Sequence, residues 1–205
     1  QIISERLSYN SPMIEMPFTS PRGFEAAVAA PHGTGPAHWF VFKGDRLLVE
    51  LGQPGPRPSD DPRVAARAGW AKIPLVNSNK LLWFEPARTL YLGHLAGTGC
   101  WAAEAPADTP PPPGLAWEGL RALFTVLEDA HFALAGRALQ LLDWDRSHRC
   151  CGRCGTPTEA KSEERVRACP ACKLAVYPRI SPAVMALVRR QGEILLGRSA
   201  HFPPG

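Results

Sequence analysis

The chain has 205 residues, of which 45% are hydrophobic and 20% are charged, proportions that are ordinary for a globular protein of one large or two small domains. Its formal net charge of +4 is too small to indicate a nucleic-acid-binding protein by itself, although it would favour an anionic small molecule. No stretch approaches the roughly 18 apolar residues of a membrane span, and no signal-peptide pattern opens the chain, so we expect a cytoplasmic protein without a membrane partner.

Residues 1–105 are expected to form a β-rich N-terminal domain, because short apolar runs alternate there with glycine and proline. The predicted strands are residues 38–42, 47–51, 81–84 and 89–92. Lys43, Gly44 and Asp45 provide a turn that joins the first two strands in an antiparallel hairpin. The proline-rich residues 52–62 indicate an exposed loop.

Residues 106–116 are expected to be a linker, because four consecutive prolines favour a stiff polyproline II segment. Ligands of SH3 domains share this composition, but the basic pattern that usually flanks them is missing here. A helical segment is expected over residues 117–147, since apolar residues recur there at intervals of three and four on both sides of Asp129, a candidate helix cap. This segment is either two helices or one bent helix.

Four cysteines carry the strongest signal in the sequence. Cys151, Cys154, Cys169 and Cys172 form two Cys-x2-Cys pairs separated by fourteen residues. Each pair can fold into a tight knuckle that aims two thiolates at one point, and two knuckles complete the tetrahedron that Zn²⁺ prefers. Because four protein ligands leave no position for water, the zinc should be structural. Disulfides would be the alternative in a secreted protein.

Cys150 competes with its neighbour for the first ligand position, because Cys150 and Cys154 also have a usable spacing. We favour Cys151, since Gly152 and Gly155 supply turn geometry to the shorter knuckle.

The zinc ribbon is expected to occupy residues 148–178 and to end in a short strand before a proline. Beyond it, apolar runs at 183–188 and 194–196 flank a polar turn and predict a hairpin. This hairpin opens a further unit, to which we assign residues 179–205.

Three segments occur in an order that is typical of one protein family. They are His131 to Leu141, Ser147 to Gly155 with the first cysteine knuckle, and Tyr177-Pro178-Arg179-Ile180-Ser181-Pro182. Together they resemble the NADH pyrophosphatase branch of the Nudix hydrolases. The N-terminal part resembles that family more loosely, through Phe42-Lys43-Gly44 and Leu90-Tyr91-Leu92-Gly93.

The resemblance implies an α+β fold, with a β-rich N-terminal domain, a helical linker, a four-cysteine zinc ribbon and the opening hairpin of a Nudix α/β/α domain. It implies a homodimeric NAD(H) pyrophosphatase that hydrolyses NAD(H) to nicotinamide mononucleotide and AMP. Some members of the family also remove NAD caps from RNA, so NAD-capped RNA is a second expected partner.

The resemblance also implies the site residues. The four cysteines match the zinc ligands, and Tyr177, Glu164, Lys43 and Arg121 match substrate contacts, the last with a shift of one residue. The ring of Tyr177 could stack on nicotinamide or adenine, Glu164 could make a polar contact, and the two basic residues could neutralise phosphate. From the residues alone, Tyr177 could simply cover the ribbon, and Lys43 could be a solvated hairpin charge.

The family's catalytic box has an Arg-Glu-x-x-Glu-Glu core that binds Mg²⁺ or Mn²⁺ and should follow the predicted hairpin. No Glu or Asp follows Glu193 in the sequence. Since pyrophosphate hydrolysis needs carboxylates to hold divalent cations, we expect that the chain stops before this box and that the 205 residues alone are inactive.

The competing functional class is a non-catalytic module that binds nucleic acid or protein through the ribbon. Basic residues near the cysteines could grip nucleic acid; they are Arg146, Arg149, Arg153, Arg165, Arg167 and Lys173. Aromatic residues are few in this region, and Glu159, Glu163 and Glu164 dilute its positive charge. A steep salt dependence of binding would favour this alternative.

Overall fold

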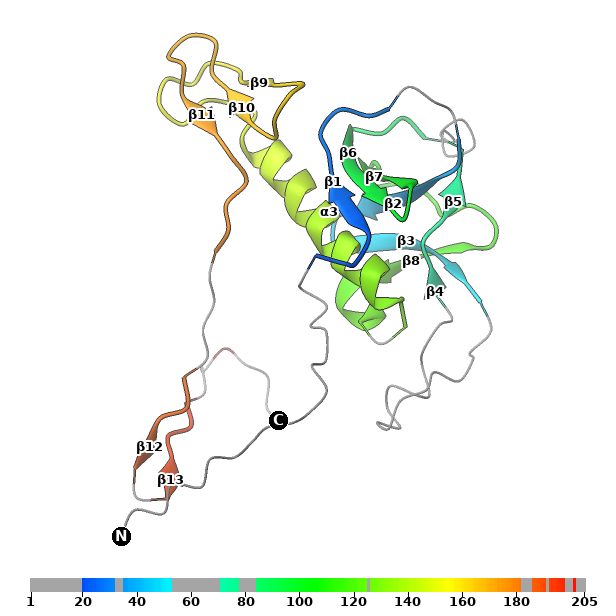
Figure 1. Cartoon of the computed structure of the whole chain (residues 1–205), viewed down its shortest axis with the longest axis vertical. Helices are drawn as coiled ribbons and strands as arrows, with labels where there is room; N and C mark the ends of the chain where they lie inside the picture. The colour runs from blue at the N-terminus through cyan, green and yellow to red at the C-terminus, as the bar shows by residue number, and fades with distance from the viewer. Residues whose placement is uncertain are drawn as a thin grey trace.

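The computed structural model describes residues 20–31, 35–52, 71–77, 84–124, 126–181, 186–190, 192–197 and 201. In this part of the chain, an eight-stranded sheet packs against one long helix, and a small three-stranded sheet follows the helix (Figure 1). The expected α+β class is therefore confirmed. The strands of the large sheet are β1 (Phe24–Ala26), β2 (Ala37–Lys43), β3 (Arg46–Leu51), β4 (Ala71–Lys72), β5 (Leu75–Val76), β6 (Arg88–Leu95), β7 (Thr98–Glu104) and β8 (Leu115–Gly119).

The large sheet has the strand order β1-β6-β7-β2-β3-β4, with β5 added beside β2 and β8 beside β3. Its pairs are antiparallel except for β2 and β7, which run parallel. The strands predicted at 38–42, 47–51 and 89–92 are confirmed as β2, β3 and β6. The strand predicted at 81–84 lies outside the described residues except for Phe84, which is not in a strand, and the loop predicted at 52–62 lies outside them except for Gly52.

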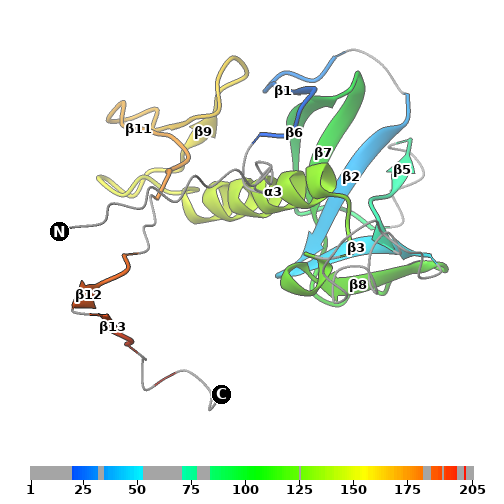
Figure 2. The ribbon, with the colours of Figure 1, turned by 60° about the horizontal axis from the view of Figure 1, so that its bottom comes forward.

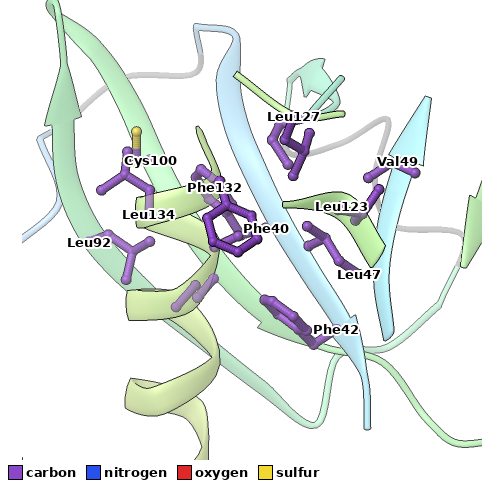
Figure 3. Close-up of a cluster of buried hydrophobic side chains, with 14 of the residues drawn as sticks. Phe40, Phe42, Leu47, Val49, Leu92, Cys100, Leu123, Leu127, Phe132 and Leu134 are labelled. Carbon is purple, nitrogen blue, oxygen red and sulfur yellow. The ribbon is translucent and has the colours of Figure 1, made fainter. Parts of the chain in front are cut away.

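Both faces of β2 are buried, which explains its uninterrupted run of apolar residues. Phe40 and Phe42 belong to the core between the sheet and the helix, whereas Trp39 and Val41 belong to a smaller cluster with Trp117 on the other face. Side chains alternate between faces along a strand, so a continuous apolar strand can serve two cores. Figure 3 shows Phe40 and Phe42 beside Leu92, Leu123 and Leu134 in the larger core.

One α-helix covers this larger core. Helix α3 (Asp129–Ser147) follows a short 3₁₀ helix, η1 (Leu120–Leu123), and buries its apolar side against β2, β6 and β7 (Figure 2). The predicted helical segment is therefore confirmed in its second half. Its cap is not as predicted, because Glu128 occupies the N-cap position and Asp129 is the first helical residue.

A pair of histidines joins the helix to the sheet. The rings of His38 on β2 and His131 on α3 have their centroids 4.6 Å apart. Nδ1 of His38 is buried and has no hydrogen-bond partner among the described residues. Nδ1 of His131 lies 3.6 Å from a carboxylate oxygen of Glu128, at the start of the helix.

Gly93 allows β1 to approach β6 closely. It has a φ of 132°, and a Cβ at this position would lie 2.0 Å from the backbone oxygen of Glu25. The pairing of β6 with β7 also shifts register between Tyr91 and Gly93. A residue other than glycine would force the backbones of β1 and β6 apart.

The proline-rich segment does not end the large sheet. Residues 115–119, immediately after it, form β8, which pairs with β3 from Arg46↔Gly119 to Glu50↔Leu115. The helix expected to begin at Trp117 is therefore wrong for residues 117–119, because a turn at Gly114, with a φ of 80°, returns the chain to the sheet. The division into segments at 105, 116, 147 and 178 stays a prediction, although the sheet contains residues from both sides of the first two limits.

The ribbon and the final hairpin are small. The ribbon's sheet has the order β11-β10-β9, formed by Ala175–Val176, Arg167–Ala168 and Glu159–Ala160. The predicted hairpin is confirmed in its described part as β12 (Arg189–Arg190) and β13 (Glu193–Ile194), whereas residues 182–185 lie outside the described residues. In Figure 1 this hairpin lies away from the large sheet. No helix among the described residues is long and apolar enough to cross a membrane.

Candidate functional site

The four predicted cysteines meet at one point. The sulfur atoms of Cys151, Cys154, Cys169 and Cys172 all lie within 4.8 Å of one another, and no other such group of metal-ligating side chains occurs among the described residues. Two of the Sγ–Sγ distances are 3.5 Å. Since Zn–S bonds of about 2.3 Å in a tetrahedron place sulfurs roughly 3.8 Å apart, the cluster fits a zinc ion bound by four thiolates.

Both cysteine pairs form the same knuckle. The amide of Gly155 donates to the carbonyl of Cys151 at 2.9 Å, and the amide of Lys173 donates to the carbonyl of Cys169 at 3.0 Å. The turn residues adopt positive φ angles, 75° at Gly155 and 62° at Lys173. The Thr156 hydroxyl lies 3.4 Å from the Cys154 sulfur, and this contact helps to lower the pKa of the Cys154 thiol to about 6, which favours the thiolate.

Cys150 lies outside the cluster. It is exposed and forms an isolated β-bridge with Pro157 at the entry to the ribbon. The geometry therefore supports Cys151, rather than Cys150, as the first ligand. Cys100 is also separate, because it is fully buried in the large core, where burial raises the pKa of its thiol to about 11.

Two of the predicted substrate contacts lie together on the ribbon. The hydroxyl of Tyr177 donates to a carboxylate oxygen of Glu164 at 3.0 Å. This hydrogen bond raises the pKa of Tyr177. Tyr177 is 51% exposed, so its ring does not simply fill the ribbon. We call these two residues the ribbon pair.

The other two predicted contacts lie outside the ribbon, Lys43 at the end of β2 and Arg121 in η1. Nζ of Lys43 donates to the carbonyl of Thr109 at 3.0 Å and lies 5.0 Å from the centre of the Trp117 ring, so it is more than a solvated hairpin charge. Arg121 is exposed and lines a cavity of about 800 Å³ that also contains Arg137 and Ile180. The structure shows no contact of Lys43 or Arg121 with the ribbon pair among the described residues.

Arginines fix the ribbon to the large sheet, a role that the sequence reasoning missed. Arg165 donates to the carbonyls of Ala27 and Tyr91, at 2.9 Å for Ala27, and burial lowers its pKa. Arg167 donates to Asp145, which also accepts from Arg88 on β6 at 3.2 Å. Each of these bonds joins residues far apart in the sequence, so no local signal could have revealed them.

These contacts weaken the nucleic-acid alternative. Arg165 and Arg167 are used within the fold, and Arg146 pairs with Glu104 and Asp143. Lys173 donates to the carbonyl of Pro170 at 2.8 Å, so four of the six basic residues proposed to grip nucleic acid are already partnered. A phosphate backbone would have to displace these interactions to bind them.

Comparisons with known proteins agree with this geometry. The chain matches the NADH pyrophosphatase-like rudimentary NUDIX domain over residues 36–144 and the NADH pyrophosphatase zinc ribbon domain over residues 146–177. The first match extends through the expected linker.

Several curated relatives carry the name NAD-capped RNA hydrolase NudC. The protein from Stutzerimonas stutzeri is 43% identical over 116 residues, covering 56% of this chain and 41% of the relative. The protein from Chromobacterium violaceum is 36% identical over 170 residues, covering 83% of this chain and 56% of the relative. The protein from Deinococcus radiodurans is 43% identical over 150 residues, covering 67% of this chain and 53% of the relative. The chain thus spans about half the length of the curated relatives it matches.

Proposed function

Because the chain belongs to the NADH pyrophosphatase-like family with a rudimentary NUDIX domain and a zinc ribbon, we propose that the protein hydrolyses the pyrophosphate of NAD(H). The products would be nicotinamide mononucleotide and AMP. NAD-capped RNA is a second proposed substrate, supported by the name of the similar proteins. The observation that carries the proposal is the ribbon pair, in which Glu164 and the exposed Tyr177 are joined beside the four cysteines.

The ribbon pair suits a planar ligand with polar edges. An exposed tyrosine ring can stack on nicotinamide or adenine, and the fixed carboxylate of Glu164 can accept a hydrogen bond from a ribose hydroxyl or an amide. Zinc bound by Cys151, Cys154, Cys169 and Cys172 would hold together a ribbon with three two-residue strands and little core. Its proposed role is structural, because all four tetrahedral positions would be taken by protein.

The basic residues are proposed to favour the phosphates. Arg121 and Arg137 line one cavity with Ile180, which is three residues after Tyr177, so positive charge lies along the chain that leaves the ribbon pair. Lys43 is a weaker candidate, because the carbonyl of Thr109 and the Trp117 ring already occupy its ammonium group.

The divalent cations implied by the family do not fit the residues in hand. No Glu or Asp follows Glu193 in the sequence, and the one group of clustered metal ligands among the described residues is the cysteine cluster. We therefore propose that Mg²⁺ or Mn²⁺ binds to residues outside this chain. The 205-residue polypeptide alone should not release AMP from NADH with either cation, and turnover by it would contradict this point.

We further propose a homodimer in a reducing, cytoplasmic compartment. The cysteines support the compartment, since they are free thiols arranged for metal rather than disulfides. Light scattering of the intact protein would give its mass, and a monomer at micromolar concentration would contradict the dimer.

The test of the function uses the intact protein and two substrates, NADH and NAD-capped RNA. Tyr177→Ala should lower kcat/KM about tenfold or more, because the loss of one stacking contact costs about 1–3 kcal/mol. Glu164→Gln should lower it about fivefold to tenfold through the loss of one charged acceptor. Glu163→Gln removes a neighbouring exposed carboxylate and is the matched control. Unchanged kinetics in both ribbon-pair variants would contradict the proposed role of these residues.

A further inference from the structure

A second cavity lies where the ribbon meets the large sheet. It has a volume of about 310 Å³ and is lined by residues 28–30, by β6 and β7, by the end of α3 and by residues 160–162 and 164–166 of the ribbon. The substrate contacts proposed above reach it only through Glu164 at its border. The site therefore does not depend on the proposed hydrolysis.

Aromatic rings form much of the cavity wall. Tyr91, Trp101 and Trp144 all line it. The rings of Tyr91 and Trp101 have their centroids 4.8 Å apart, and Trp101 stacks on Trp39 behind it at 5.5 Å with an interplanar angle of 12°. This packing holds the wall in place before any ligand arrives, which reduces the cost of binding a flat molecule.

Two charged residues of the cavity wall, Arg165 and Asp145, already have hydrogen-bond partners within the fold. Arg165 donates to the carbonyls of Ala27 and Tyr91. Asp145 accepts from Arg88 and Arg167. Neither side chain is free to bind a charged ligand, so the chemistry of the wall depends on its neutral groups.

Two neutral polar groups in this wall lack partners. The Tyr91 hydroxyl oxygen and the Trp144 indole nitrogen are buried and have no hydrogen-bond partner among the described residues. Tyr91 is 4% exposed and Trp144 is 8% exposed. Buried polar groups are nearly always hydrogen-bonded in folded proteins, so two orphans lining one cavity indicate a missing partner.

We propose that this cavity binds the neutral heterocyclic base of a nucleoside or nucleotide. A base is flat and packs on aromatic rings, and its ring nitrogens and carbonyls can accept the Trp144 N–H while its other edge bonds the Tyr91 hydroxyl. The volume is at the lower end of ligand pockets, which suits one base with its sugar rather than a dinucleotide. Lys161 and Ser162, exposed at the border, can contact the sugar or a phosphate.

The experiment follows the indole N–H signals of the ¹⁵N-labelled 205-residue chain during titration with adenosine, AMP and a short oligoadenylate. The Trp144 signal, assigned with Trp144→Phe, should move downfield as the N–H gains an acceptor. The signals of Trp39 and Trp117 should stay, because their N–H groups already donate to the carbonyls of Val76 and Thr109. AMP and the oligoadenylate distinguish a free nucleotide from a base within RNA.

The Tyr91→Phe variant tests the second group, since it removes only the hydroxyl and should weaken binding about fivefold to tenfold. Thr98→Val removes a hydroxyl of β7 outside the cavity and should leave the affinity unchanged. Thermal melting checks that each variant is folded. If Trp144→Phe does not fold, the indole signals of the original chain and the affinity of Tyr91→Phe still test the proposal.

A stationary Trp144 signal with all three probes would overturn the proposal, as would full affinity in Tyr91→Phe. Binding that is lost in Tyr177→Ala but kept in Tyr91→Phe would also overturn it. That last result would place the base on the ribbon pair and would leave the proposed hydrolase function standing.

Discussion

Replacing His38 by phenylalanine should remove part of the loss of stability that we expect on acidification. Burial, with a further contribution from the nearby His131, lowers the pKa of His38 from 6.5 to about 4, whereas Glu128 opposes both effects. Burial also lowers the pKa of His131. Two imidazolium rings at a centroid distance of 4.6 Å would repel each other between the sheet and the helix.

Proton linkage gives the sign and the size of the change in the free energy of unfolding with pH. Below pH 6.5 the unfolded chain binds a proton at His38, but the folded chain does not until about pH 4. The free energy of unfolding should therefore fall as the pH decreases through this interval. A shift from 6.5 to about 4 corresponds to about 3 kcal/mol, and because the side chain is only partly buried we expect about 1–2 kcal/mol of it to appear.

The assay is urea unfolding at several pH values between 7 and 4, followed by tryptophan fluorescence. His38→Phe keeps a ring in place, so its stability near pH 7 should equal or exceed that of the original chain, and the two curves should diverge by about 1–2 kcal/mol near pH 4. His94→Gln removes a histidine elsewhere in the same sheet and serves as the control. Comparing variants at the same pH cancels any loss of metal from the ribbon. Parallel curves for His38→Phe and the original chain would refute the reasoning.

Three further predictions concern the metal, the buried charges and the close strand approach. Cys169→Ser should abolish stoichiometric zinc, measured by mass spectrometry of the metal content, whereas Cys150→Ser should keep one zinc per chain. Asp145→Asn should lower the free energy of unfolding by about 2 kcal/mol, measured in urea, because the partly buried Arg167 loses its carboxylate partner and Arg88 keeps only Glu104; a change below about 0.5 kcal/mol would argue against this network. Gly93→Ala should cost about 3 kcal/mol through backbone strain and the clash with β1, whereas Gly136→Ala, with open space in α3, should raise thermal stability slightly.

The sequence predicted those features whose cause is local. The spacing of the cysteine pairs is enough to predict two knuckles, and the structure brings the four sulfurs together as expected. The turn at Gly44 and the apolar runs beside it predict the β2–β3 hairpin, because each strand pairs with its neighbour in the chain.

The sequence did not predict the features that depend on partners far away along the chain. Strand β8 is a five-residue segment after a proline run, and it is a strand because β3, far back in the sequence, offers it an edge. The apolar spacing from Leu120 to Leu127 fits a helix. In the structure, these apolar residues lie instead in a 3₁₀ turn and in the loop after it, and both face the core. Likewise, the partners of Arg165 and Asp145 become neighbours only when the ribbon packs on the sheet. The roles of Tyr177, Glu164, Lys43 and Arg121 remain predictions.

The parallel pairing of β2 with β7 has a consequence for the order of folding. The β2–β3 and β6–β7 hairpins are closed by short turns and can form early, each from its own segment of chain. Residues 37–42 must then pair with residues 99–104, and the long stretch of chain between them, which includes β3 to β6, makes this contact entropically costly to close. We therefore expect the joining of the two hairpins to limit the folding rate, and changes in the Trp39–Trp101 stack across this seam to report on that step.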